Sequence, residues 1–133
     1  MATIFDKLNL KDQQEILVLN APASFEPELA KLHVLTLHRN IESVADIQFV
    51  LAFVTRKEEV DALAAGIAKR VKGDAVVWFA YPKGTSKKIK CDFNRDSGWD
   101  AFKALGFDTV RAIAIDEDWS ALRFRRLEHI KAR

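Results

Sequence analysis

The sequence has few of the residues that build disulfide bonds, metal clusters or flexible loops. Its 133 residues include one cysteine, five glycines and three prolines. A single cysteine, Cys91, excludes an intramolecular disulfide and a metal site built from several cysteines. The three histidines, His33, His38 and His129, show no metal-ligand spacing, so we expect no metal. The signatures G-x-S-x-G, H-E-x-x-H and C-x-x-C are also absent, so the sequence points to no common hydrolase, zinc protease or thiol oxidoreductase.

Long apolar runs are missing as well. The longest have about seven residues, too few to cross a bilayer as a helix, so we expect no membrane partner. The N-terminal segment has no basic region followed by an apolar core. It therefore does not resemble a signal peptide, and the expected location is the cytoplasm.

Charge of one sign does not dominate the chain. The formal net charge is only +2, so overall charge does not suggest nucleic acid as a partner. The charge is unevenly distributed, however. Residues 1–82 carry 9 basic and 11 acidic side chains, whereas residues 83–133 carry 12 and 8. An anion-binding surface is therefore expected in residues 83–133.

The pattern of apolar runs predicts one α/β domain spanning residues 1–133. Residues 1–14 are expected to form an irregular or short helical arm against the core. Three segments are predicted as helices: 25–32, 55–72, and a helix that begins at residue 94 or 96 and ends at 105. Six runs are predicted as strands: 15–20, 33–37, 46–54, 75–81, 108–115 and 119–127.

Capping residues mark the expected helix ends. Ser24 is expected to cap the first helix. Thr55 and Glu58 form a capping box for the second helix, and Gly73 is expected to end it. The third helix is expected to turn three side chains inward: Trp99, Phe102 and Leu105.

The order of helices and strands predicts a three-layer, mainly parallel sheet with right-handed crossovers. Only Asp116, Glu117 and Asp118 separate the last two strands, so these should form an antiparallel hairpin. This order resembles a class I methyltransferase-like Rossmann domain, shortened by one helix–strand–helix unit between the second and third strands. The resemblance implies a six-stranded sheet of order 2-1-3-4-6-5, with strand 6 antiparallel.

Local motifs also resemble a bacterial domain-of-unknown-function family of small proteins. Its members combine an early L-N-A-P-like turn, a strand that ends in P-K and a closing D-E-x-W-S-x-L-x-F signature. The corresponding segments here are Leu19–Pro22, Pro82-Lys83 and Asp116–Phe124. This resemblance spans roughly residues 15–127 and implies a fold but no assigned activity.

The sequence departs from the methyltransferase pattern at the cofactor. Class I methyltransferases place a glycine-rich turn after strand 1 and commonly an acidic residue at the end of strand 2, where it holds the ribose hydroxyls, as in dinucleotide sites. Here the first turn, Asn20–Ser24, contains no glycine, and the second strand is followed by His38, Arg39 and Asn40. We therefore expect no cofactor, S-adenosylmethionine included.

A basic loop after the fourth strand is the main candidate for a ligand site. It contains Lys83, Thr85, Ser86, Lys87 and Lys88. Ligands of open α/β sheets bind outside the carboxyl ends of the strands, and ammonium and hydroxyl groups can hold a phosphate or a carboxylate. The alternative is a solvated lysine-rich loop.

The turn after the first strand should lie at the same edge, at the switch point of the sheet. Asn20 and Ser24 could bind a ligand there, although Ser24 could instead cap its helix. Phe25 and Trp99 are large side chains that could fill this edge.

Two acidic groups complete the candidates. Asp92 and Asp96 could act as an acid–base pair or bind a hard cation, but they could also cap a helix and pair with Arg95. The segment Asp116–Asp118 could bind a cation, form a solvated turn, or pair with the lysines of the basic loop.

These features favour a non-enzymatic binding or adaptor module for an anionic small molecule or an acidic protein partner. One alternative is a divergent enzyme, methyltransferase-like or phosphate-handling, that uses Asp92 or Asp96 with the lysines. Another is a weak nucleic-acid binder, which would show a steep salt dependence.

Overall fold

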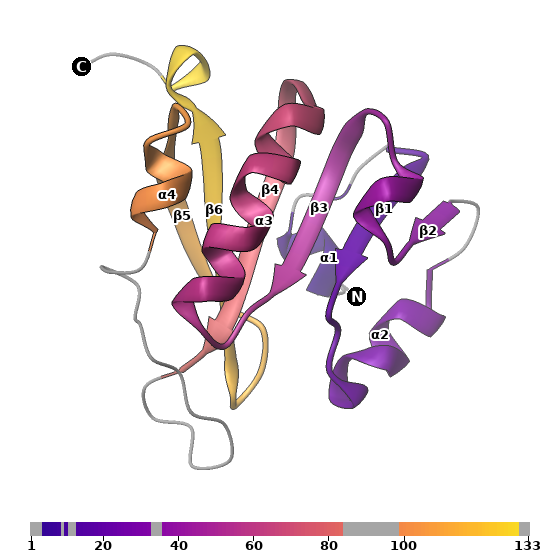
Figure 1. The fold of residues 1–133 in the computed structure, drawn as a ribbon. Helices are drawn as coiled ribbons and strands as arrows, with labels where there is room; N and C mark the ends of the chain where they lie inside the picture. The colour runs from indigo at the N-terminus through magenta and orange to yellow at the C-terminus, as the bar shows by residue number, and fades with distance from the viewer. Residues whose placement is uncertain (1–3, 9, 11–12, 33–35, 84–98, 131–133) are drawn as a thin grey trace.

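A computed structural model describes residues 4–8, 10, 13–32, 36–83 and 99–130. Among these residues, six strands form one sheet of order β2-β1-β3-β4-β6-β5 (Figure 1). β1 to β4 are parallel to one another, and β6 is antiparallel to both β4 and β5. The predicted sheet order and C-terminal hairpin are thereby confirmed. The strands are β1 (Glu15–Leu19), β2 (Thr36–His38), β3 (Ile47–Phe53), β4 (Val71–Pro82), β5 (Phe107–Ala114) and β6 (Trp119–Arg126).

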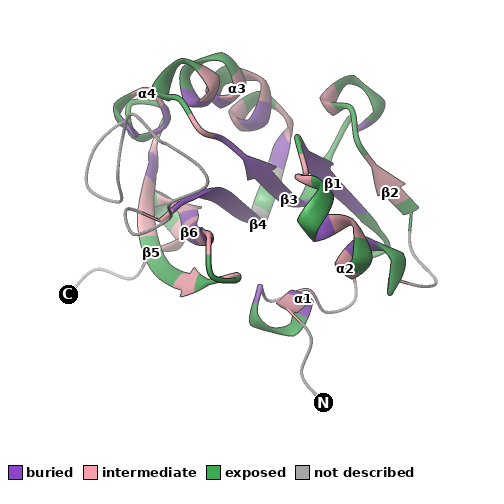
Figure 2. Cartoon of the chain, turned by 90° about the horizontal axis from the view of Figure 1, so that it is seen from below, coloured by how far each residue is buried: buried purple, intermediate pink, exposed green. Residues whose placement is uncertain are grey.

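Helices cover both faces of the sheet, as Figure 2 shows from the carboxyl edge. α3 (Lys57–Arg70) and α4 (Asp100–Lys103) cover one face, and α1 (Ile4–Lys7) and α2 (Glu26–Ala30) lie toward the other. Three 3₁₀ turns complete the described elements: η1 (Ala23–Phe25), η2 (Ile41–Ser43) and η3 (Leu127–His129). The predicted three-layer arrangement is therefore present. None of the described helices has the length and apolar character needed to cross a membrane.

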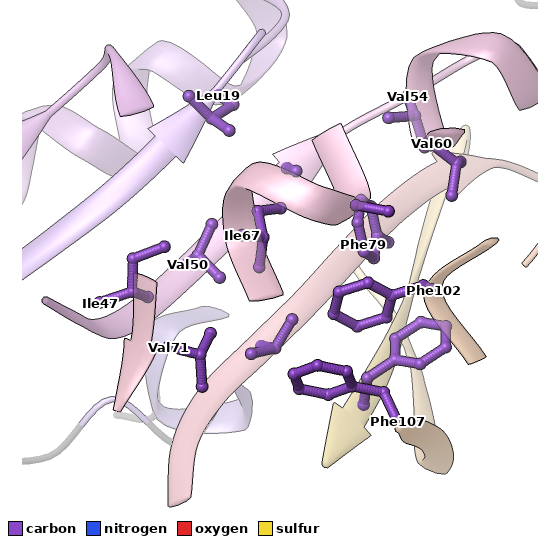
Figure 3. Packing of buried hydrophobic residues seen from close by; sticks show 14 of the residues in the cluster. Leu19, Ile47, Val50, Val54, Val60, Ile67, Val71, Phe79, Phe102 and Phe107 are labelled. Atoms are coloured by element: carbon purple, nitrogen blue, oxygen red, sulfur yellow. The ribbon is translucent and has the colours of Figure 1, made fainter. Parts of the chain in front are cut away.

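The face under α3 and α4 holds the larger apolar core (Figure 3). Its centre is Phe79 of β4, whose ring lies 5.3 Å from that of Phe102 and 5.7 Å from that of Phe124. Phe102 in turn stacks on Phe107 with 4.1 Å between the ring centroids. These rings join α4 to β4, β5 and β6, so the terminal hairpin is part of the core.

The opposite face buries the N-terminal arm. Phe5 and Leu8 are buried there against β3 and β4. The indole Nε1 of Trp78, in the middle of β4, donates a 2.8 Å hydrogen bond to the Leu8 carbonyl oxygen. The expected contact between the arm and the core is therefore confirmed, and a buried polar group holds the arm in place.

The ends of α3 differ from those that the sequence predicts. Its N-cap is Arg56 rather than Thr55, because Glu59 rather than Glu58 reaches back, and the helix begins at Lys57. The Glu59 carboxylate accepts hydrogen bonds from the backbone N–H groups of Thr55 (2.7 Å) and Arg56 (3.0 Å). The helix also ends at Arg70, before Gly73, because Val71 already pairs with Ile47 as the first residue of β4.

Gly73 instead lies in an irregular stretch near the start of β4. Its φ is +59°, a left-handed conformation that suits glycine, and the register between β3 and β4 shifts here. The Arg126 guanidinium closes the end of α3 by donating hydrogen bonds to Ala68 O (2.8 Å) and Val71 O (3.3 Å). A side chain from β6 thus caps the helix where a glycine was expected to end it.

Two of the three side chains predicted to point inward from the third helix do so. Trp99 and Phe102 are buried, but Leu105 is 42% exposed. The helix ends at Lys103, so the three-residue spacing no longer points Leu105 inward. Phe107 occupies the core position instead.

Candidate functional site

The turn after β1 lies at the carboxyl edge of the sheet, as predicted. Asn20 has a φ of +58°, a left-handed conformation that asparagine tolerates better than most residues with a Cβ. Its side-chain Nδ2 donates a 3.4 Å hydrogen bond to the carbonyl oxygen of Phe53, the last residue of β3. The Asn20 side chain therefore joins the ends of β1 and β3, where a glycine-rich turn would leave space.

Aromatic rings fill the edge next to this turn. Phe25 is only 2% exposed, and its ring lies 5.0 Å from Phe53 and 5.7 Å from Phe5. Phe53 lies 5.1 Å from Trp119, which pairs with Pro82 at the end of β4. Phe25 follows β1, Phe53 ends β3, and Trp119 lies beside the end of β4. A continuous row of rings therefore crosses the carboxyl edge on the face where α1 and α2 lie.

The end of β2 carries basic side chains that already have partners. His38 Nε2 lies 3.0 Å from Glu15 Oε1. Arg39 forms a bidentate ion pair with Glu26, with two N–H···O distances of 2.8 Å. The hydrogen bond from Arg39 lowers the pKa of Glu26, so Glu26 is held in its charged form. Among the described residues at this strand end, no carboxylate is left without a basic partner. None therefore corresponds to the acidic residue that holds the ribose hydroxyls in methyltransferases.

The structure contradicts the expectation that Ser24 caps a helix. It lies inside η1, and neither η1 nor α2 has a side-chain cap. The residue in the cap position of α2 is Phe25, because the 3₁₀ turn comes first and places Ser24 too early. Ser24 instead lines a pocket formed with α1 and the turn between β5 and β6.

Lys83 and the hairpin tip lie side by side. The Lys83 backbone N–H donates a 2.8 Å hydrogen bond to the Asp118 carbonyl oxygen. The Asp116 carboxylate accepts hydrogen bonds from the N–H groups of Asp118 (2.8 Å) and Trp119 (2.9 Å), so it stabilises the turn. The part of the chain that the structure describes contains no cluster of three or more acidic, histidine or cysteine side chains that could hold a metal ion.

The other predicted site residues lie outside the described residues. These are Thr85, Ser86, Lys87, Lys88, Asp92 and Asp96. The structure therefore places Asn20 against the end of β3, Ser24 in η1 and Lys83 beside the hairpin tip. The sequence pattern missed the contribution of Ile4, Glu28 and Ile115 to the pocket around Ser24, because none of them belongs to a motif.

Comparison with known proteins supports the fold. No family model and no curated protein matches the sequence. A SAM-dependent methyltransferase from Aquifex aeolicus matches with a TM-score of 0.68, over 93% of this chain and 88% of that one, at 12% identity. The fold is that of class I methyltransferases. The fibrillarin pre-rRNA processing protein of Methanococcus jannaschii matches with a TM-score of 0.56, at 11% identity over 87% of this chain and 67% of that one.

The described residues do not fit S-adenosylmethionine in the manner expected of this fold. The first turn has no glycine, its Asn20 side chain bridges two strands, and Phe25 fills the adjoining space. The basic side chains at the end of β2 are already paired with carboxylates, His38 with Glu15 and Arg39 with Glu26. Identities of 11 to 12% show the shared fold alone. Whether the protein binds a cofactor therefore depends on the side chains at this edge.

Proposed function

We propose that the protein is a non-enzymatic binding module with a methyltransferase-like fold. It binds a phosphate or carboxylate group carried by a small molecule or by an acidic protein partner. The observation that carries the proposal is the burial of Phe25 against Phe53, with 5.0 Å between the ring centroids. A methyl donor at the end of β1 would need the space that these rings occupy.

Lys83 supports an anionic ligand. It directly follows β4 at the edge where open α/β sheets bind ligands. Its backbone is fixed by the hydrogen bond to Asp118, and its half-buried side chain forms no ion pair with a carboxylate of the described residues. In the sequence it is followed by the hydroxyl and ammonium groups of Thr85, Ser86, Lys87 and Lys88. Such groups suit an anion with several oxygen atoms.

The test is a titration of the full chain with pyrophosphate and, separately, with succinate, followed by the amide signal of Lys83 in NMR spectra. We expect a saturable shift. The anion that binds with the lower dissociation constant indicates whether phosphate or carboxylate is preferred. Lys83→Gln should weaken binding by up to about fivefold, because one exposed charge contact contributes up to about 1 kcal/mol. Lys69→Gln, at the opposite edge on α3, is the matched control and should leave the affinity unchanged. If neither anion moves the Lys83 amide, no anion binds here.

A divergent enzyme, methyltransferase-like or phosphate-handling, is the second candidate. The similarity to the Aquifex aeolicus methyltransferase favours it. A thermal-shift titration with S-adenosylmethionine separates the two candidates. A ligand present at 100 times its dissociation constant stabilises a protein by about 2.7 kcal/mol, which is readily measured. We expect no stabilisation, and a saturable rise in the melting temperature would replace the binding-module proposal by an enzymatic one.

A further inference from the structure

A pocket of about 250 Å³ opens at the carboxyl edge, apart from Lys83. Figure 2 shows α1 lying between α2 and the turn that joins β5 to β6. The pocket is lined by residues of α1, η1, α2 and this turn. Its volume corresponds to that of about eight water molecules, so it suits a small organic ligand. The lining residues are Ile4, Ser24, Phe25, Glu28, Ile115 and Asp116.

The segments that form the pocket are held in place by contacts elsewhere. The hydrogen bond from Trp78 to Leu8 fixes the end of α1, and the ring of Phe5 packs 5.7 Å from that of Phe25. On the other side, the N–H of Ile115 donates a 2.9 Å hydrogen bond to the Trp119 carbonyl oxygen. The apolar wall of the pocket (Ile4, Phe25 and Ile115) is therefore positioned before any ligand arrives.

Asp116 offers one oxygen atom to a ligand. Both of its hydrogen bonds from the turn, to the N–H groups of Asp118 and Trp119, end on Oδ1. The second oxygen, Oδ2, has no partner among the described residues. Because the turn fixes the carboxylate through Oδ1, Oδ2 is an oriented acceptor.

Glu28 and Ser24 add two more acceptors. Glu28 Oε2 pairs with Lys31 Nζ at 3.0 Å, but the Lys31 side chain is 62% exposed. Exposed ion pairs of this kind are weak, so a ligand cation can replace Lys31. The Ser24 hydroxyl caps no helix and is available as an acceptor.

These groups select one class of ligand. An anion would meet two carboxylates and no positively charged lining residue. A neutral apolar ligand would cover carboxylates without pairing them, which is unfavourable. Hard metal cations prefer six or more oxygen ligands, whereas half of this lining is apolar. We propose that the pocket binds a small organic amine, protonated at neutral pH, whose ammonium group faces Glu28 and Asp116 and whose apolar part covers the apolar wall.

This site has different lining residues from the proposed anion site and opposes it in charge, although Asp116 lies in the hairpin tip whose Asp118 carbonyl accepts the Lys83 N–H. Probes of opposite charge therefore distinguish the two sites. The first experiment titrates the full chain with benzylamine, benzyl alcohol and benzoate, three compounds of nearly equal size that differ in charge. We expect saturable shifts of the amide signals of Ser24, Phe25 and Asp116 with benzylamine, and at least about tenfold weaker binding of the other two. Equal binding of benzylamine and benzyl alcohol, or no saturable shift with benzylamine, overturns the proposal.

Variants test the two carboxylates. Asp116→Asn removes the charge but keeps Oδ1 as an acceptor for the turn, and because Asp116 is exposed it should weaken benzylamine binding by up to about fivefold. Glu117→Gln makes the same charge change one residue away, outside the pocket, and should alter binding by less than about twofold. Glu28→Gln leaves the turn intact and should weaken binding even if the Asp116 variant does not fold. Binding that is unchanged in Glu28→Gln, or that falls equally in Asp116→Asn and Glu117→Gln, refutes the site.

Discussion

Replacing Phe25 by alanine tests whether this ring fills the space at the carboxyl edge. Substitution of a buried phenylalanine by alanine costs about 3 to 5 kcal/mol, through lost burial and the cavity that remains. Phe25 is 2% exposed and contacts two other rings, at 5.0 and 5.7 Å, which places it in this range. The short η1 and α2 can move inward, so we expect a loss of about 3 kcal/mol.

The assay is urea unfolding followed by tryptophan fluorescence. With a urea dependence of about 2 kcal/mol per M, the expected loss lowers the unfolding midpoint by roughly 1.5 M. A domain of this size has a stability of about 5 to 15 kcal/mol, so the variant should remain folded. Leu127→Ala, at a 56% exposed leucine, is the control and should change stability by less than about 0.5 kcal/mol. A loss below about 1 kcal/mol for Phe25→Ala would show that the ring does not close the edge, and would refute the proposed non-enzymatic role.

Three further outcomes are expected. Trp78→Phe leaves the buried Leu8 carbonyl without its donor, so it should cost about 1 to 3 kcal/mol and speed amide exchange in α1. Arg126→Met removes two hydrogen bonds to the end of α3, and urea unfolding should show a loss of about 1 to 3 kcal/mol together with faster amide exchange in the last turn of α3. Arg39→Ala should raise the pKa of Glu26 toward its ordinary value in a ¹³C carboxyl titration, since the hydrogen bond from Arg39 lowers it. A lowered pKa means that the ion pair stabilises the fold above the ordinary glutamate pKa, and that this contribution is lost as the pH falls through the lowered value. A Glu26 pKa that does not change in Arg39→Ala would contradict the ion pair.

The sheet could be predicted because its strands carry strong local patterns. Residues 75–81 are apolar without interruption and are all buried in β4. Only three residues separate the two predicted strands on either side of residues 116–118. So short a connection joins antiparallel strands, which predicted the hairpin. Helix ends were harder to predict, because distant side chains decide them. Arg126, in a strand 56 residues beyond the end of α3 at Arg70, closes this helix, and no local pattern around Gly73 indicates this.

The candidate site could be predicted only in outline. The missing glycine and the missing acidic residue are visible in the sequence, but the ring that fills the space is not. Phe25 packs against Phe5 and Phe53, which lie 20 and 28 residues away, so its position depends on the docked arm and on β3. The pocket around Ser24 combines side chains from Ile4 to Asp116, which only the completed fold brings together.

The position of β6 between β4 and β5 has a consequence for how the chain folds. β4 is buried along residues 75–81, yet its second neighbour is the last of the described strands. Until β6 has been synthesised, β4 is an exposed, apolar edge that can pair with other chains, and β5 has no described neighbour in the sheet. A chain that stops before Trp119 should therefore aggregate during synthesis, whereas one that includes β6 can close its sheet in a single docking step of the hairpin.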